Sequence, residues 1–253
     1  MSRRPPSSRR PPGTVSLERA LSKLGIASRG EARRWIEKGR VTVDGRAAAD
    51  PLAPVVPERI RIEVDGRPAG RAAPLTVLLH KPRGVVTTRS DPEGRPTVYS
   101  CLEGIETFLG PVGRLDAATT GLLLLTNDTR LADWLTDPRN AVPRVYLVTV
   151  QGEMGEDEAR RLEEGVEDGG ERLAARSVRV RKRSGRETHL VVELTEGKNR
   201  EIRRMLAAVG HGVTRLKRVA FGGLELGDLA PGKWRVVSAE ELREAFPGVA
   251  GLK

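Results

Sequence analysis

An unbroken apolar run, Leu122–Leu125, limits the fold of this chain more than any other stretch. It lies within GRLDAATTGLLLLTND (residues 113–128) and is followed by Asn127 and Asp128, which favour a turn. A short apolar run that ends in turn residues is typical of a strand in a protein core. An acid, Asp116, lies about one turn upstream, where burial is costly unless the charge is paired. Spacing alone leaves two interpretations open: a turn residue that hydrogen-bonds its own backbone, or a functional acid.

Helical and strand-like patterns are interspersed along residues 75–247. We expect helices that begin at Asn127 or Asp128 and at Ser238, and helices over 156–165 and 199–209. We expect strands over 75–80, 144–150, 177–183 and 188–197, and we expect residues 81–88 to turn into one more strand. Mixed helices and hairpin-like strands indicate the α+β class, with a mixed, mainly antiparallel central sheet flanked by helices.

Residues 14–66 have the pattern of a small separate module. Apolar residues at helical spacing predict a first helix over 16–24, and Ser28 and Glu31 form a capping box at the start of a second. Two short alternating strands follow, each of which ends in Asp-Gly. The chain is therefore divided into a disordered basic tail (1–13), this module (14–66), a linker (67–74) and a larger domain (75–247).

The excess of basic residues is concentrated in three places. The chain has 44 Lys and Arg against 34 Asp and Glu. The cations gather in the tail, between residues 19 and 40, and between residues 197 and 218, which favours a nucleic-acid partner. In the module, four cations could follow a phosphate backbone, although an ordinary amphipathic helix would also carry some of them. These candidates are Arg29, Arg33, Lys38 and Arg40.

Several common chemistries lack their sequence signature. Cys101 is the one cysteine, and the three histidines follow no metal-ligand spacing. No phosphate-binding loop, dinucleotide fingerprint or serine nucleophile elbow is present. No apolar run is long enough for a membrane helix, and the N-terminus lacks the apolar segment of a secretory signal. We therefore expect a cytoplasmic protein that has no membrane partner and no bound metal.

Four segments together resemble a known enzyme family. GRLDAATTGLLLLTND resembles the nucleophile motif of the pseudouridine synthases, in the branch that holds the ribosomal small-subunit enzyme A and the large-subunit enzymes B, E and F. HKPRGVVTT, RVYLVTV and EGKNREIRRMLAAVGHGVTRLKRVAFGGLEL resemble further motifs of that branch in the same order. ASRGEARRWIEKGRVTVDG resembles the small RNA-binding domain named after ribosomal protein S-four. The resemblance implies isomerisation of uridine to pseudouridine, which needs no cofactor.

The resemblance also assigns roles to individual residues. It implies that Asp116 is the nucleophile, that Tyr146 lies against the base, and that Arg114 enters the space that the base vacates. On the helix at 199–209, Arg203 lies on the flank of the apolar stripe, so we expect it to pair with Asp116, whereas Arg204 should face solvent or RNA. The remaining expected RNA contacts are Lys81, Lys198 and Arg200.

The rRNA target is the least constrained part of this interpretation. NREIRRM resembles the B-type enzymes that act on the large subunit more than it resembles the small-subunit enzyme. We therefore expect a monomer that acts on large-subunit rRNA or on a ribosome-assembly intermediate. A small-subunit target and a noncatalytic RNA-binding assembly factor on the same fold are alternatives. A glycosidase-like enzyme with paired carboxylates is a remote one, because no second acid occupies a matching motif.

Overall fold

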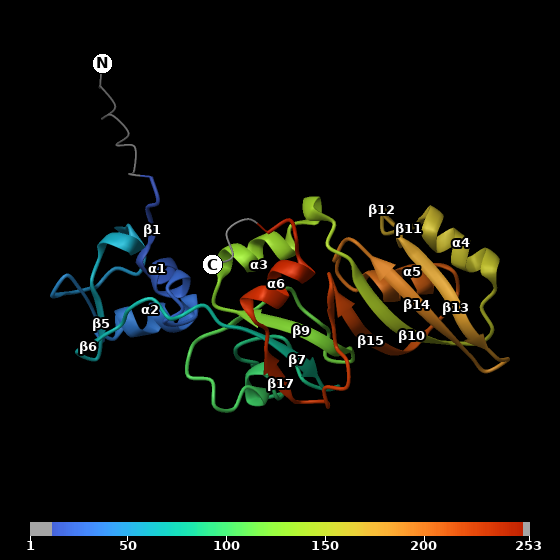
Figure 1. Ribbon diagram of the computed structural model, residues 1–253, viewed down its shortest axis with the longest axis horizontal. Coiled ribbons are helices and arrows are strands. Elements are labelled where there is room, and N and C mark those ends of the chain that lie inside the picture. The colour runs from blue at the N-terminus through green and yellow to red at the C-terminus, as the bar shows by residue number, and fades with distance from the viewer. Residues whose placement is uncertain (1–11, 250–253) are drawn as a thin grey trace, which may run out of the picture. The chain divides into compact units, whose positions relative to one another are not determined.

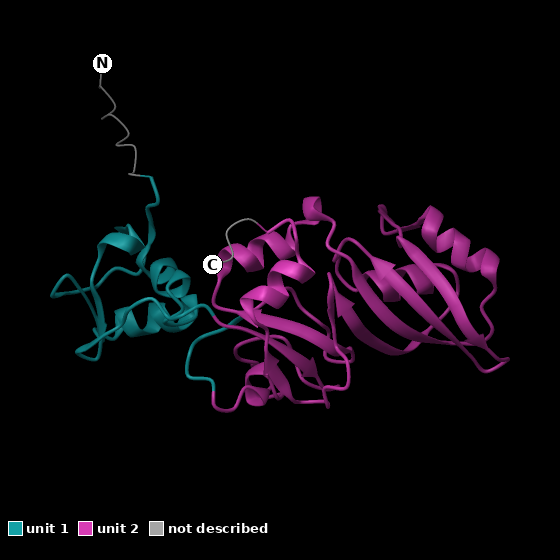
Figure 2. Ribbon diagram, viewed as in Figure 1, with its two compact units in different colours: residues 1–74, 105–110 teal, residues 75–104, 111–253 magenta. Residues whose placement is uncertain are grey.

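The computed structural model describes residues 12–249 and divides the chain into two compact units (Figure 2). Unit 1 comprises Met1–Pro74 and Ile105–Gly110, and unit 2 comprises Leu75–Gly104 and Pro111–Lys253. The basic tail expected over residues 1–13 lies, up to residue 11, outside the described residues. No helix within residues 12–249 is long and apolar enough to cross a membrane.

Unit 1 has the expected two helices followed by short strands. Ser28 accepts a hydrogen bond from the backbone of Glu31, and the Glu31 side chain accepts one in return, which completes the capping box. The apolar faces of the helices pack on the strands around Leu17, Ile36 and Ile62. Its elements are β1 (Val15–Ser16), α1 (Leu17–Lys23), α2 (Arg29–Glu37), β2 (Val41–Val43), β3 (Arg46–Ala47), β4 (Pro54–Val55), η1 (Pro57–Arg59), β5 (Ile62–Val64) and β6 (Arg67–Pro68). The strand β6 pairs with β5, so residues expected to begin the linker belong to this small sheet.

Unit 2 is built on one large sheet (Figure 1). Its main path runs β13-β14-β10-β15-β9-β7-β17, and all its pairs are antiparallel except β15 with β9. Its strands are β7 (Thr76–Lys81), β9 (Thr120–Thr126), β10 (Arg144–Gln151), β13 (Ser177–Arg183), β14 (Glu187–Leu194), β15 (Val213–Phe221), β16 (Leu224–Glu225) and β17 (Trp234–Val236), and β8 (Gly110–Pro111) pairs with β9. The strands β11 (Val166–Asp168) and β12 (Glu171–Leu173) form a separate hairpin. The large sheet is the expected mixed, mainly antiparallel sheet.

Helices cover this sheet. Leucines of β7 and β9 pack against α3 and α6 in one buried cluster, in which Leu124 is fully buried. Asp128 caps α3 by accepting hydrogen bonds from two backbone amides of its first turn. The helical elements are η2 (Val98–Cys101), α3 (Thr129–Thr136), η3 (Pro138–Asn140), α4 (Glu156–Glu164), α5 (Glu201–Ala208) and α6 (Ala239–Ala245). The strand that the apolar run predicted is therefore central, as β9.

The second strand expected within residues 81–88 is wrong. Pro82 and Gly84, the latter at a φ of +86°, interrupt the strand conformation, and Val86 forms only an isolated bridge with Thr97. The polar groups of this segment bind the loop that precedes β9 instead. The backbone of Gly84 donates to Ala117 O at 2.7 Å, which fixes one side of that loop.

Candidate active site

A cleft of about 400 Å³ opens in unit 2 beside the loop that precedes β9. This size is within the usual range for small-molecule sites. Side chains from the loop at 112–116, from β10 and β15, and from the segment at 196–203 line it. The cleft therefore collects residues from three motifs that are far apart in the sequence.

Asp116 lies in a tight turn at the edge of this cleft. Its backbone carbonyl accepts a hydrogen bond from Thr119 N at 3.0 Å, so the turn interpretation of these residues is correct for the backbone. The neighbouring Leu115 is buried and bonds Thr87 through both its backbone groups. The Asp116 carboxylate itself stays 34% exposed, so it is open to a substrate.

Lys81 supports this turn from the core side. Its side chain is fully buried, and Nζ donates to Thr119 O at 2.8 Å, to Pro82 O at 3.0 Å and to Ala117 O at 3.5 Å. Burial lowers the pKa of Lys81 to about 8, although the nearby Asp116 opposes the shift. The expectation that Lys81 contacts RNA is therefore wrong in this structure, because its ammonium group donates to loop carbonyls within the core.

Two arginines approach the Asp116 carboxylate. Arg203 Nε lies 4.0 Å from Asp116 Oδ2, as the helix-face argument predicted, and Arg200 Nη1 lies 3.5 Å from the same oxygen. Arg203 Nη1 donates a hydrogen bond to Val213 O at 3.2 Å, which fixes the side chain. The buried Arg203 Nε has no hydrogen-bond partner among the described residues. Burial lowers the pKa of Arg203, and Arg200 adds to this while Asp116 opposes it.

Arg200 was expected only as a phosphate contact. It precedes α5 in a left-handed conformation, with φ of +49°, which directs its side chain back toward the loop. Nothing in the residue pattern signals such a backbone conformation at an arginine. The structure therefore joins Arg200 to the expected pair of Asp116 and Arg203.

Tyr146 and Arg114 also line the cleft. Tyr146 lies on β10, is 8% exposed, and is paired in register with Arg218 of β15. Arg114 is exposed two residues before Asp116. Both positions are compatible with the roles that the sequence suggested, in which Tyr146 contacts the base and Arg114 replaces it.

The floor of the cleft contains charged residues that sequence analysis missed. Arg144 and Arg218 each place the guanidinium carbon about 5 Å from the ring centre of Phe221, at 5.0 and 5.1 Å. Arg144, Arg218 and Glu201 are all less than 9% exposed. The alternation of side chains along β10 and β15 does not predict the burial of Arg144 and Arg218, because a charged residue on a strand is ordinarily assigned to the solvent face.

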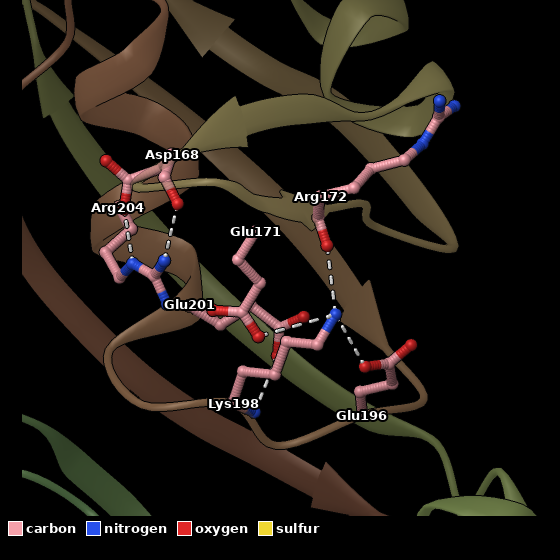
Figure 3. A network of polar contacts seen from close by, with 7 residues as sticks. All are labelled: Asp168, Glu171, Arg172, Glu196, Lys198, Glu201 and Arg204. Atoms are coloured by element: carbon pink, nitrogen blue, oxygen red, sulfur yellow. Dashed lines mark hydrogen bonds and ion pairs between the residues drawn. The ribbon is translucent and has the colours of Figure 1, made fainter.

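A polar network that includes some of the cleft-lining residues holds the start of α5 (Figure 3). Arg204 pairs with Asp168 and, at 2.8 Å, with Glu171 of the β11–β12 hairpin. Lys198 pairs with Glu196 at 3.0 Å and donates to Arg172 O at 3.0 Å. Arg204 therefore turns away from Asp116 as expected. Acidic residues pair with both Arg204 and Lys198, and the RNA contacts expected at these two residues stay predictions.

The cations expected to bind RNA in unit 1 are all exposed. Arg33 pairs with Glu18 at 2.8 Å. Arg40 pairs with Asp65 and lies over the ring of Trp35 at 5.3 Å. Arg29 and Lys38 form no ion pair of this kind within residues 12–249, so these two positions leave the most charge for a polyanion.

Comparisons with known proteins bear on the family and the fold of this chain. Residues 76–208 match the family model described as RNA pseudouridylate synthase, and residues 16–58 match that of the S4 domain. An uncharacterized RNA pseudouridine synthase of Aquifex aeolicus is 38% identical over 94% of this chain and 96% of its own length. The ribosomal large subunit pseudouridine synthase B of Bacillus subtilis is 34% identical over 90% and 93% of the two chains. A crystal structure of a pseudouridylate synthase superposes with a TM-score of 0.64 at 24% identity, over 91% of this chain and 99% of that one, which supports the fold.

Proposed function

This chain belongs to the RNA pseudouridylate synthase family and carries an S4 domain, and from that premise we propose that it isomerises one uridine of large-subunit ribosomal RNA with Asp116 as the nucleophile. The observation that carries the assignment of Asp116 is its position. It is a partly exposed carboxylate at the edge of a cleft of about 400 Å³, with two guanidinium groups within 4.0 Å of one of its oxygens.

The reaction exchanges one glycosidic bond for another. The bond from uracil N1 to ribose C1′ breaks, the base turns, and a bond forms from C5 to C1′, while C5 loses a proton and N1 gains one. Asp116 can serve by attacking the sugar, by attacking the pyrimidine ring, or by removing a sugar proton along a glycal route. In each case the carboxylate must be ionised, and the neighbouring Arg200 and Arg203 favour that form.

The target uridine has to leave its stack to reach Asp116. Extrusion of a base requires unstacking, which is least costly in a loop or an already distorted helix. Tyr146 offers a ring on which the extracted base can stack and a hydroxyl that can take part in proton transfer at C5. Arg114, at the exposed rim, is positioned to occupy the vacated space in the RNA.

The substrate assignment rests on the relatives and on charge. The relative of Bacillus subtilis is named for the large ribosomal subunit, and this chain matches it over most of both lengths. We assign RNA affinity to residues 14–66 and catalysis to residues 75–247, and we propose that one copy of the chain is sufficient. Action on rRNA, either free or in an assembly intermediate, implies a cytoplasmic location.

Pseudouridine mapping tests this function directly. Ribosomal RNA from cells with the gene, without it, and with Asp116→Asn in its place should differ at one large-subunit site, which is modified only with the intact gene. The Asn variant is nearly isosteric but is a poor nucleophile, so its purified form should bind an rRNA fragment normally. Retention of every site in the deletion strain would instead favour the noncatalytic assembly factor, and loss of a small-subunit site would correct the target.

A further inference from the structure

Besides Arg203 Nε, which lies beside Asp116, two buried polar atoms of cleft-lining residues have no hydrogen-bond partner within the described chain. They are Glu201 Oε1 and Arg218 Nη2, and both residues are 3% exposed and line the cleft. A buried donor or acceptor that lacks a partner is unfavourable and therefore uncommon. Because Glu201 and Arg218 both line the cleft, an acceptor and a donor without partners on these side chains point to a ligand that supplies the complementary groups.

Each side chain is fixed by its other polar atom. Glu201 Oε2 accepts a hydrogen bond from Lys198 N at 3.1 Å, and Arg218 Nε donates to Leu122 O at 2.7 Å. The ring of Phe221 also lies under the Arg218 guanidinium. Both unpartnered atoms consequently belong to anchored side chains, as a recognition site requires.

The hydrogen-bonding edge of uracil matches these two groups. Uracil presents a carbonyl oxygen, the N3–H and a second carbonyl oxygen in sequence, whereas cytosine presents an amino group and an unprotonated N3. Building on the proposed function, we propose that Glu201 accepts the N3–H of the extracted uracil and that Arg218 donates to an adjacent carbonyl. The two residues thereby select uracil over cytosine.

The same contacts serve both the substrate and the product base. Turning uracil about the line from N3 to C6 exchanges N1 with C5 and one carbonyl with the other, but it leaves N3–H in place. A carboxylate that binds N3–H therefore holds the base at the one hydrogen-bonding group that the turn does not move. Arg218 meets a carbonyl oxygen before and after the turn, so neither contact has to be rebuilt.

Glu201→Gln tests the acceptor. Because Lys198 N still needs an acceptor, the amide oxygen is expected to take that place and to direct the NH₂ group at the base. Single-turnover conversion of the uridine RNA should fall about tenfold or more, because the amide offers the base a donor where an acceptor is needed. The same RNA with cytidine at the target should become a stronger competitive inhibitor, because the amide can donate to cytosine N3. The matched control is Glu225→Gln, at an exposed glutamate of β16 outside the cleft lining, and it should change neither quantity.

Arg218→Lys tests the donor while keeping the positive charge. The wild type should convert 4-thiouridine or 2-thiouridine more slowly than uridine, because sulfur is the weaker acceptor, and the Lys variant should lose this preference. Arg144→Lys is the control, since Arg144 contacts the same ring but donates instead to the carbonyls of Val142, Thr195 and Leu135. Thermal unfolding of each variant separates loss of fold from loss of recognition.

The wild-type protein alone can overturn the proposal. If it converts uridine but treats 3-methyluridine and both thiouridines equally well in the same RNA, the edge of the base is not read, and Glu201 and Arg218 have another role. If the Glu201→Gln variant loses conversion without any change in cytidine inhibition, Glu201 only caps the start of α5 and does not contact the base. Failure of the wild type to convert any uridine would instead overturn the proposed function.

Discussion

At the scale of single residues, the site depends on how many charged groups surround one carboxylate. Asp116 has Arg200 and Arg203 beside it and the buried Lys81 beneath its turn. The two arginines differ in burial, since the Arg203 side chain is 16% exposed and that of Arg200 is 53% exposed. A charge pair shielded from water is less screened, so the two should contribute unequally.

Substitution of the three arginines should separate their roles. Arg203→Met is expected to slow single-turnover conversion by about 100-fold or more, because it removes the sheltered partner of the nucleophile. Arg200→Met, at an exposed pair, should slow it by about fivefold or less. Arg204→Met, whose partners are Asp168 and Glu171, is the matched control and should leave the rate constant unchanged at saturating RNA. Equal losses at Arg203 and Arg204 would contradict the geometry described for α5.

Lys81 should give the folded protein a distinctive pH dependence. Its pKa is lowered from 10.5 to about 8, so between these pH values the unfolded chain binds more protons at this residue than the folded chain does. The contribution of Lys81 to the free energy of unfolding should therefore rise with pH, by about 3 kcal/mol across that window. Urea unfolding of the wild type and of Lys81→Met at several pH values measures the difference.

The control for that comparison is Lys23→Met, at an exposed lysine of α1, which should follow the wild type at every pH. If Lys81→Met also runs parallel to the wild type from pH 8 upward, Lys81 is not held in an unfavourable charged state. In that case its hydrogen bonds to the loop carbonyls compensate fully for its burial.

At the scale of elements, the sequence predicted what apolar periodicity controls. The run Leu122–Leu125 marked β9, and the capping residues marked the starts of α2 and α3, because these features are local. The strand expected within residues 81–88 failed where Pro82 and Gly84 outweighed the β-branched residues that follow them. The burial of Lys81 was missed for a different reason, since only the tertiary fold places three carbonyls around its ammonium group.

The parallel pairing of β9 with β15 depends on Gly121. A Cβ there would lie 2.1 Å from Arg218 O, and its φ of +107° disfavours other residues. Gly121→Ala should therefore lower the free energy of unfolding by about 3 kcal/mol or more. Gly113→Ala, also at a positive φ but with its nearest neighbour at 3.9 Å, should cost only about 1 to 2 kcal/mol. Equal effects in urea unfolding would show that backbone strain, and not the close approach of the strands, limits position 121.

At the scale of the whole molecule, the proposed function assigns RNA affinity to unit 1 and chemistry to unit 2. Every candidate for chemistry lies in unit 2, and unit 1 presents exposed cations on α2 and just after it. Deletion of residues 1–72 would not test this division cleanly, because Ile105–Gly110 belongs to unit 1 and would lose its packing partners. Point substitutions in the full chain leave both units intact and are the better test.

The final prediction concerns RNA affinity. The double variant Arg29→Ala/Lys38→Ala removes two exposed cations and should weaken binding of an rRNA fragment. It should also reduce the slope of log Kd against log salt concentration by about 1.4 to 1.8, because two fewer phosphates are neutralised. Arg33→Ala on the same helix is the control and should change the slope less, since Glu18 already pairs with this arginine. Conversion at saturating RNA should stay unchanged in both proteins, so a fall in that rate constant, or an unaltered salt slope in the double variant, would contradict the assignment of affinity to unit 1.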